Sequence, residues 1–285
     1  MIEFRDVHAS YDGSAPILKG VSFTIRDGEF VAFVGTNGAG KSTTMRLMNG
    51  LLKPDAGQVL IDGVSTAELR TSELARRVGF FVPESRPPDL LHHGARGAAV
   101  RVPCARAGGR EADARVDAII EEFGFDADDD PFLLNRGARQ LLALASIVVL
   151  APPVVVLDEP TTGLDYRECA KVMDIVRRIH ERGTTVIMVC HDMEVVADYA
   201  TRCIVMSDGT VVDDAPTFDV LRNRDTLERA SLVPPQIVDL SFELARDMPQ
   251  LAETAVARAN TVDEMLAAVA EEARTTQDVE RSVCA

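Results

Sequence analysis

The feature that most constrains the fold is a glycine-rich run between an apolar segment and a helix-forming one. Residues 35–43 read GTNGAGKST and directly follow the apolar segment EFVAFV. Backbone N–H groups of such a loop surround phosphates, while Lys41 reaches the β- and γ-phosphates and the Ser42 hydroxyl binds Mg²⁺. The N-terminus of the helix expected from Ser42 to Leu51 adds favourable partial positive charge. The run therefore predicts a nucleotide-binding α/β fold, but alone it does not distinguish GTPases, kinases and ATPases.

All nine residues of the run are predicted to bind the nucleotide. They are Gly35, Thr36, Asn37, Gly38, Ala39, Gly40, Lys41, Ser42 and Thr43. The alternative is a glycine-rich turn that occurs by chance and has no role in binding. The strand before the run and the helix after it are both in register, which strongly favours the phosphate-binding interpretation.

A second motif follows the short apolar segment VVVL at 154–157, which reads as a fully buried strand. Asp158 stands at the end of this strand and is expected to hold Mg²⁺ through water. Glu159 is placed to polarise the attacking water as a general base. The alternative is a solvated acidic strand end, but the string that continues from these two carboxylates, LDEPTTGLD, is far more specific than that.

This string resembles the Walker B segment and D-loop of ABC-type ATPases, and the resemblance covers about residues 1–215 apart from one segment. It implies an α/β P-loop cassette with a mostly parallel core sheet, an antiparallel β subdomain and a helical subdomain at about 82–152. Residues 216–285 are expected to form a helical C-terminal extension. The activity implied is ATP hydrolysis coupled to transport, with ATP and Mg²⁺ as ligands.

The resemblance also implies roles for further residues. Tyr11 stands where the family carries an aromatic ring that stacks on adenine. His191 stands where the family places a histidine against the γ-phosphate. Asp165 belongs to the D-loop, and Asn135 and Gly137 belong to the signature segment, which contacts ATP held by the opposite cassette. The alternatives are an ordinary strand-end aromatic for Tyr11 and a structural role for His191.

The signature departs from the usual LSGGQ of the family and reads LNRGA at 134–138. The longer segment PFLLNRGARQLLALAS resembles energy-coupling-factor cassettes, which serve cobalt, nickel and vitamin transporters. Asn135 replaces the serine that would donate to the γ-phosphate. Because asparagine can also donate a hydrogen bond and cap a helix, we expect weakened but surviving function.

The remaining elements alternate between strands and helices, as in a mostly parallel sheet covered on both faces. Strands are expected at the N-terminus, within residues 1–34, and near 58–61 and 77–82. The elements expected later in the chain are helices at 111–124, 138–150, 166–181 and 192–200, and strands at 184–189 and 203–206.

Residues 82–110 fit no pattern of this family. They are rich in Pro, Gly and Arg, and no Gln occurs between Gln58 and Gln140, although the cassette should carry its Q-loop here. When the codons from Val82 onward are read one base later, permitted bases spell FQNPDHQIF, which resembles the energy-coupling-factor Q-loop. We therefore favour a local frame shift. The alternative is an unusual flexible coupling loop.

Within the C-terminal extension, residues 232–236 read LVPPQ and look like a linker. Thr261 and Glu264 form a capping box, and Val262, Met265, Leu266 and Val269 follow at helical spacing. We expect this stripe to be buried in a regulatory or dimer contact. Truncation at about residue 240 should then leave ATP binding intact.

Charge and the chain ends bear on the partners. The formal charge of -15 is opposite to that of most nucleic-acid binders, so no nucleic-acid partner is expected. No signal peptide or membrane span is recognisable, which favours a peripheral protein at the cytoplasmic face of the membrane. The expected partners are a second ABC cassette, as a homo- or heterodimer, and a transmembrane transporter subunit. The alternatives are an ordinary importer cassette, a coupling-defective non-catalytic cassette, and a soluble ABC ATPase acting on DNA or ribosomes.

Overall fold

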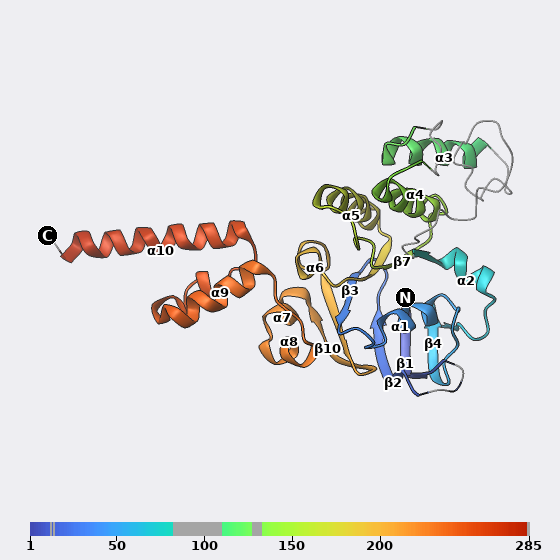
Figure 1. The fold of residues 1–285 in the computed structure, drawn as a ribbon, viewed down its shortest axis with the longest axis horizontal. Coiled ribbons are helices and arrows are strands. Elements are labelled where there is room, and N and C mark those ends of the chain that lie inside the picture. Colours follow the sequence, from blue (N-terminus) through green and yellow to red (C-terminus); the bar gives the residue numbers. More distant parts are fainter. Residues whose placement is uncertain (12, 14, 82–109, 127–132, 284–285) are drawn as a thin grey trace.

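The computed structural model describes residues 1–11, 13, 15–81, 110–126 and 133–283. Two sheets and the helices around them form the body, and the last helix projects away from it (Figure 1). All but the last residue of the segment interpreted as frame-shifted, 82–110, lie outside the described residues, so that interpretation stays a prediction.

A six-stranded sheet with the order β10-β9-β3-β8-β7-β6 runs through the body. All neighbouring strands are parallel except β9 and β10, so the mostly parallel core sheet is confirmed. The antiparallel edge strand β10 was not predicted. The strands are β3 (Phe30–Gly35), β6 (Val78–Phe81), β7 (Val154–Asp158), β8 (Thr185–Val189), β9 (Arg202–Ser207) and β10 (Thr210–Pro216).

Both faces of this sheet are covered, because successive side chains of its central strand point to opposite sides. Phe30 and Val34 of β3 belong to one hydrophobic cluster, while Val31 and Phe33 belong to the other. All four side chains are almost fully buried. This arrangement explains why the sequence of the strand is continuously apolar rather than alternating.

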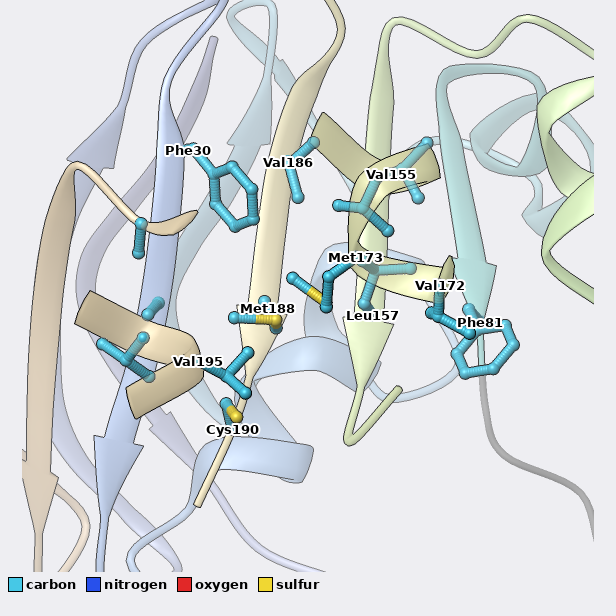
Figure 2. Packing of buried hydrophobic residues seen from close by; sticks show 14 of the residues in the cluster. Phe30, Phe81, Val155, Leu157, Val172, Met173, Val186, Met188, Cys190 and Val195 are labelled. Carbon is cyan, nitrogen blue, oxygen red and sulfur yellow. The ribbon is translucent and has the colours of Figure 1, made fainter. Parts of the chain in front are cut away.

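Helix α5 (Tyr166–Glu181) covers one of these faces. Figure 2 shows Met173 of α5 among Leu157 of β7 and Val186 and Met188 of β8. Burying side chains of this size stabilises the fold by about 1.5–3 kcal/mol each. The packing holds the carboxyl ends of the two strands in fixed positions, and these ends carry the polar residues described below.

The second sheet is antiparallel, with the order β2-β1-β4-β5, and confirms the expected antiparallel β subdomain. Leu18, Val21, Phe23 and Ile25 are buried along β2 with polar residues between them, the pattern of a strand with one covered face. The strands are β1 (Ile2–Ala9), β2 (Leu18–Ile25), β4 (Ala56–Ile61) and β5 (Val64–Ser65).

Nine further helices are described besides α5. Helices α3 and α4 lie together beyond β6 and β7, at the position expected for the helical subdomain (Figure 1). Helices α2, α7, α8 and α9 were not predicted as separate elements. The helices are α1 (Lys41–Met48), α2 (Thr71–Arg77), α3 (Arg110–Phe123), α4 (Arg136–Val148), α6 (Met193–Tyr199), α7 (Thr217–Arg222), α8 (Arg224–Ala230), α9 (Gln236–Asp247) and α10 (Val262–Val283).

The main core continues beyond residue 215. Val220 and Leu221 of α7 and Ala230 of α8 belong to the larger cluster of the body. Only from α9 onward do the hydrophobic residues form a separate cluster, made by Val256, Ala259, Met265 and Ala268. The division of the chain at residues 215 and 216 stays a prediction.

Three of the four stripe residues on α10 are exposed in this single chain, so their expected burial in a regulatory or dimer contact stays a prediction. Met265 is 6% exposed, but Val262 is 57% exposed, Leu266 63% and Val269 48%. Met265 and Ala268 of α10 are buried in the small cluster of the extension, and most of the helix projects away from the body in Figure 1. The cap at its start is present, since the Thr261 hydroxyl accepts a hydrogen bond from the backbone N–H of Glu264. No helix among the described residues has the length and apolar character needed to cross a bilayer.

Candidate nucleotide site

The glycine-rich run forms the loop between β3 and α1, as its sequence predicted. Gly40 precedes the helix in a left-handed conformation with φ of 100°, and no side chain caps the first turn of α1. A Cβ at Gly35 would lie 2.0 Å from the carbonyl oxygen of Met206 in the neighbouring strand. The loop therefore requires glycine at both positions, and it leaves the N-terminal N–H groups of α1 available to an anion.

Lys41 is buried beneath this loop. Its ammonium group donates hydrogen bonds to the carbonyl oxygens of Gly35 (2.7 Å) and Thr36 (2.8 Å). Burial lowers the pKa of Lys41, while the carboxylates of Glu159 and Asp158 act in the opposite direction. The cation is thus held in place by two loop carbonyls, at the position where the phosphates of a nucleotide are expected.

Two oxygen ligands stand together beside Lys41. The Ser42 hydroxyl lies 3.4 Å from an oxygen of Asp158, at the carboxyl end of β7. Burial is the main cause that raises the pKa of Asp158, and the hydrogen bond from Ser42 opposes it. A partly buried carboxylate next to a hydroxyl suits a hard cation such as Mg²⁺, which takes oxygen ligands and retains water or phosphate oxygens in its other positions.

Glu159 follows Asp158 and turns away from the strand with φ of 50°. One of its carboxylate oxygens lies 3.1 Å from Nε2 of His191, which follows β8. The other accepts a hydrogen bond of 2.9 Å from the hydroxyl of Thr162. The predicted base and the predicted histidine, 32 positions apart in the sequence, are therefore in direct contact.

Tyr11 lies against the first turns of α1. Its hydroxyl accepts a hydrogen bond of 2.8 Å from Arg46 and lies 3.4 Å from the hydroxyl of Thr43. The Arg46 guanidinium stands 5.7 Å from the centre of the ring. The ring is thus next to the end of the phosphate loop. That contact is compatible with its predicted place beside the base of a nucleotide.

The signature residues lie elsewhere in the molecule. Asn135 caps α4, where its side-chain oxygen accepts a hydrogen bond of 2.8 Å from the backbone N–H of Ala138. Gly137 packs against Glu168 of α5, and Asp165 caps that helix. One chain therefore contains two groups of predicted site residues, one around Lys41 and one at the start of α4.

Sequence reasoning missed Thr162, Arg136 and Arg46, each of which contacts a predicted site residue or its loop. Thr162 stands inside the same motif as Glu159. The direction of the Thr162 hydroxyl depends on the turn after β7. A linear pattern does not reveal that turn.

Three comparisons relate this geometry to known proteins. The family profile described as "ABC transporter" matches residues 18–162. A putative ABC transporter ATP-binding protein of Caldanaerobacter subterraneus subsp. tengcongensis is 36% identical over 260 residues, which cover 89% of this chain and 45% of that protein. The chain thus spans less than half the length of this curated relative.

The other two matches cover most of both chains. The energy-coupling factor transporter ATP-binding protein EcfA2 of Clostridium perfringens is 36% identical over 241 residues, covering 80% of this chain and 82% of that protein. A solved structure, the dimeric post-hydrolysis state of the ATP-binding cassette MJ0796 bound to ADP and Pi, superposes with a TM-score of 0.63. It is 27% identical and covers 76% of this chain and 99% of that one.

Proposed function

Since the chain belongs to the ABC transporter ATP-binding family, we propose that it binds and hydrolyses ATP as the cassette of an energy-coupling-factor type transporter. The observation that carries the proposal is the meeting of Lys41, Ser42, Asp158, Glu159 and His191 at the carboxyl ends of the parallel strands and the start of α1. In open parallel sheets this edge is where ligands bind.

The loop at 35–40 and the first turn of α1 would surround the phosphates with N–H groups. Lys41 would exchange its two carbonyl partners for β- and γ-phosphate oxygens. Ser42 and Asp158 would hold Mg²⁺, which neutralises charge on the phosphates when it is bound. Tyr11 would stack on the base, where its aromatic face suffices.

Glu159 would accept a proton from the water that attacks the γ-phosphate in line with the leaving ADP. His191, in contact with the same carboxylate, would lie against the γ-phosphate. The products are ADP and inorganic phosphate. The solved post-hydrolysis cassette bound to ADP and Pi supports this reaction for the family.

The proposed working unit is a dimer in which Asn135, Gly137 and Asp165 of one cassette meet ATP held by the other. Asn135 and Asp165 cap helices in this chain, and no hydrogen bond among the described residues joins them to the loop at 35–42, which supports a second copy as their partner. The proposed further partner is a transmembrane transporter subunit at the cytoplasmic face of the membrane. If residues 82–110 are frame-shifted, restoring the frame should recover binding to that subunit.

The test is nucleotide binding by the full chain, measured with and without Mg²⁺, together with phosphate release. Lys41→Ala should weaken ATP binding at least about tenfold, because charge-assisted hydrogen bonds contribute about 1.5–3 kcal/mol each. Lys19→Ala is the control, since Lys19 is an exposed lysine of β2. Equal ATP affinity for Lys41→Ala and the parent chain would contradict the proposed site.

A further inference from the structure

A chain of contacts joins the start of α4 to the carboxylate of Glu159. A guanidinium nitrogen of Arg136 donates a hydrogen bond of 3.1 Å to the carbonyl oxygen of Thr162. The hydroxyl of the same Thr162 donates one of 2.9 Å to Glu159, whose other oxygen meets His191. Thr162 therefore connects the two. Its backbone carbonyl is bound by Arg136 of α4, and its side-chain hydroxyl binds the carboxylate of Glu159.

The turn itself fixes where the Thr162 hydroxyl points. The backbone N–H of Thr162 donates to the carbonyl oxygen of Glu159 at 3.3 Å, which closes a tight turn between the two residues. The Arg136 guanidinium rests directly on the next residue, Gly163, whose φ is 74°. A Cβ at Gly163 would lie 2.5 Å from the guanidinium carbon, so only glycine allows this approach.

A second contact joins the first turn of α4 to the first turn of α5. Gly137 of α4 lies against the carboxylate of Glu168, and a Cβ on that glycine would come within 2.5 Å of its oxygen. Glu168 in turn closes the capping box of α5 with Asp165. The start of α4 and the segment 162–168 are therefore in contact at two places, so a displacement of α4 changes the surroundings of the Thr162 turn.

We propose that Thr162 and Arg136 are positioning residues for Glu159, and that they transmit the position of α4 to the carboxylate that activates water. The inference rests on the proposed function and deepens it. A glutamate side chain has three rotatable bonds, and a general base acts only when its oxygen is aimed at the water. The Thr162 hydroxyl occupies one lone pair of the carboxylate and fixes its orientation, which leaves other lone pairs for the water.

Arg136 acts one step further away. It holds the carbonyl of Thr162 and therefore the turn, but it makes no contact with Glu159 itself. Removing the Arg136 guanidinium should allow the turn to relax while the Thr162 hydroxyl stays in place. The expected loss is therefore smaller than the loss caused by removing the hydroxyl, and it should vanish once the hydroxyl is absent.

The test compares kcat and KM for MgATP in the full chain. Thr162→Val keeps the shape of the side chain and removes the donor, and it should lower kcat about tenfold with KM unchanged. Thr162→Ser restores the hydroxyl and should return kcat to within about twofold of the parent. Arg136→Met should lower kcat about threefold, whereas Arg139→Met, one turn along α4, should leave it unchanged.

The double variant Thr162→Val/Arg136→Met decides whether the two residues form one chain. It should have the same kcat as Thr162→Val alone, because Arg136 acts only through Thr162. Parent kcat for Thr162→Val would overturn the inference, as would a double variant that loses the product of the two single effects. If Thr162→Val fails to fold, Thr162→Ala provides the same comparison.

Failure of this inference differs from failure of the proposed function. Glu159→Gln, measured beside the other variants, should abolish most hydrolysis if the base is correctly assigned. A slow Glu159→Gln with an unaffected Thr162→Val rejects the positioning role and keeps the base. Parent activity in Glu159→Gln rejects the base and the positioning role together.

Discussion

The body of the cassette and its C-terminal extension both contain amphipathic segments, but the two regions bury their apolar residues to different degrees. In the body, residues of β3 and its neighbours enter two large clusters on opposite faces of one sheet. In the extension, the separate cluster has four buried members, and three of the four apolar stripe residues of α10 remain exposed. The comparison shows that the same helical spacing predicts burial only where a second surface lies opposite it.

Polar contacts replace part of the missing apolar contact in the extension. The Arg222 guanidinium donates hydrogen bonds to the carbonyls of Ala257 and Ala259 and to the hydroxyl of Ser241. It also lies 5.1 Å from the centre of the Phe242 ring. One arginine at the end of α7 therefore joins the main core to α9 and to the segment 257–259.

The largest expected effect is a cavity in the body. Phe33 is fully buried in β3 and its ring lies edge-on to Phe23 with centroids 5.3 Å apart. Phe33→Ala should lower the free energy of unfolding by about 3–5 kcal/mol. Urea unfolding followed by circular dichroism measures this loss. An equal loss in Leu266→Ala, a truncation on the exposed face of α10, would contradict the difference between the two regions.

How far the sequence predicted the fold can be seen from the same two regions. The strand at 154–157 and the helix at 166–181 were predicted because they are long, periodic or bounded by motifs. The stripe on α10 had an equally clear period, but periodicity does not say whether a partner surface exists. Edge strand β10 was missed because Asp213 and Asp214 interrupt its apolar pattern. The sheet tolerates these two residues because β10 lies at its edge and pairs with one neighbour only.

In the candidate site, too, the sequence predicted some residues and missed others. Lys41, Ser42, Asp158 and Glu159 were predicted from two short motifs, since phosphate and metal chemistry require those residue types at those spacings. The link to Arg136 was not predicted, because it depends on the turn at 162–163 and on the packing of α4 against α5. Contacts of this kind exist only after the fold has formed.

A smaller effect is expected where the extension joins the body. Arg222→Met keeps the length of the side chain but removes its hydrogen bonds, and it should destabilise α9 and α10 by about 1–2 kcal/mol. Amide hydrogen exchange should accelerate in those helices and stay unchanged in β3. Leu266→Ser is the control, because an exposed position should change stability by less than about 0.5 kcal/mol. Acceleration throughout β3 would show that the two regions unfold as one unit.

The smallest expected effect is a gain in stability rather than a loss, and it concerns Asp158 in the candidate site. Burial raises the pKa of Asp158 above its usual 3.8. The folded chain therefore binds this proton more tightly than the unfolded chain, and stability falls as the pH rises through the raised pKa. Asp158→Asn should gain about 0.5–1 kcal/mol at pH 7 without nucleotide, a modest value because the carboxylate is partly exposed.

The pH dependence checks the sign of this effect. Thermal unfolding of Asp158→Asn and the parent should converge below about pH 4, where both side chains are neutral, and diverge as the pH rises. A variant that is less stable than the parent at pH 7 and equally stable at low pH would show that the ionised carboxylate stabilises the body. The destabilisation attributed to burial of the Asp158 carboxylate would then be absent.

The central claim is that Glu159 activates the water in a site that binds ATP through other residues. The most direct measurement compares ATP affinity and phosphate release for Glu159→Gln and the parent chain, with the exposed Glu181→Gln as the control. The account predicts an ATP affinity within about twofold of the parent and a hydrolysis rate lower by about 10²–10⁴-fold. Hydrolysis at the parent rate by a variant that still binds ATP would contradict it.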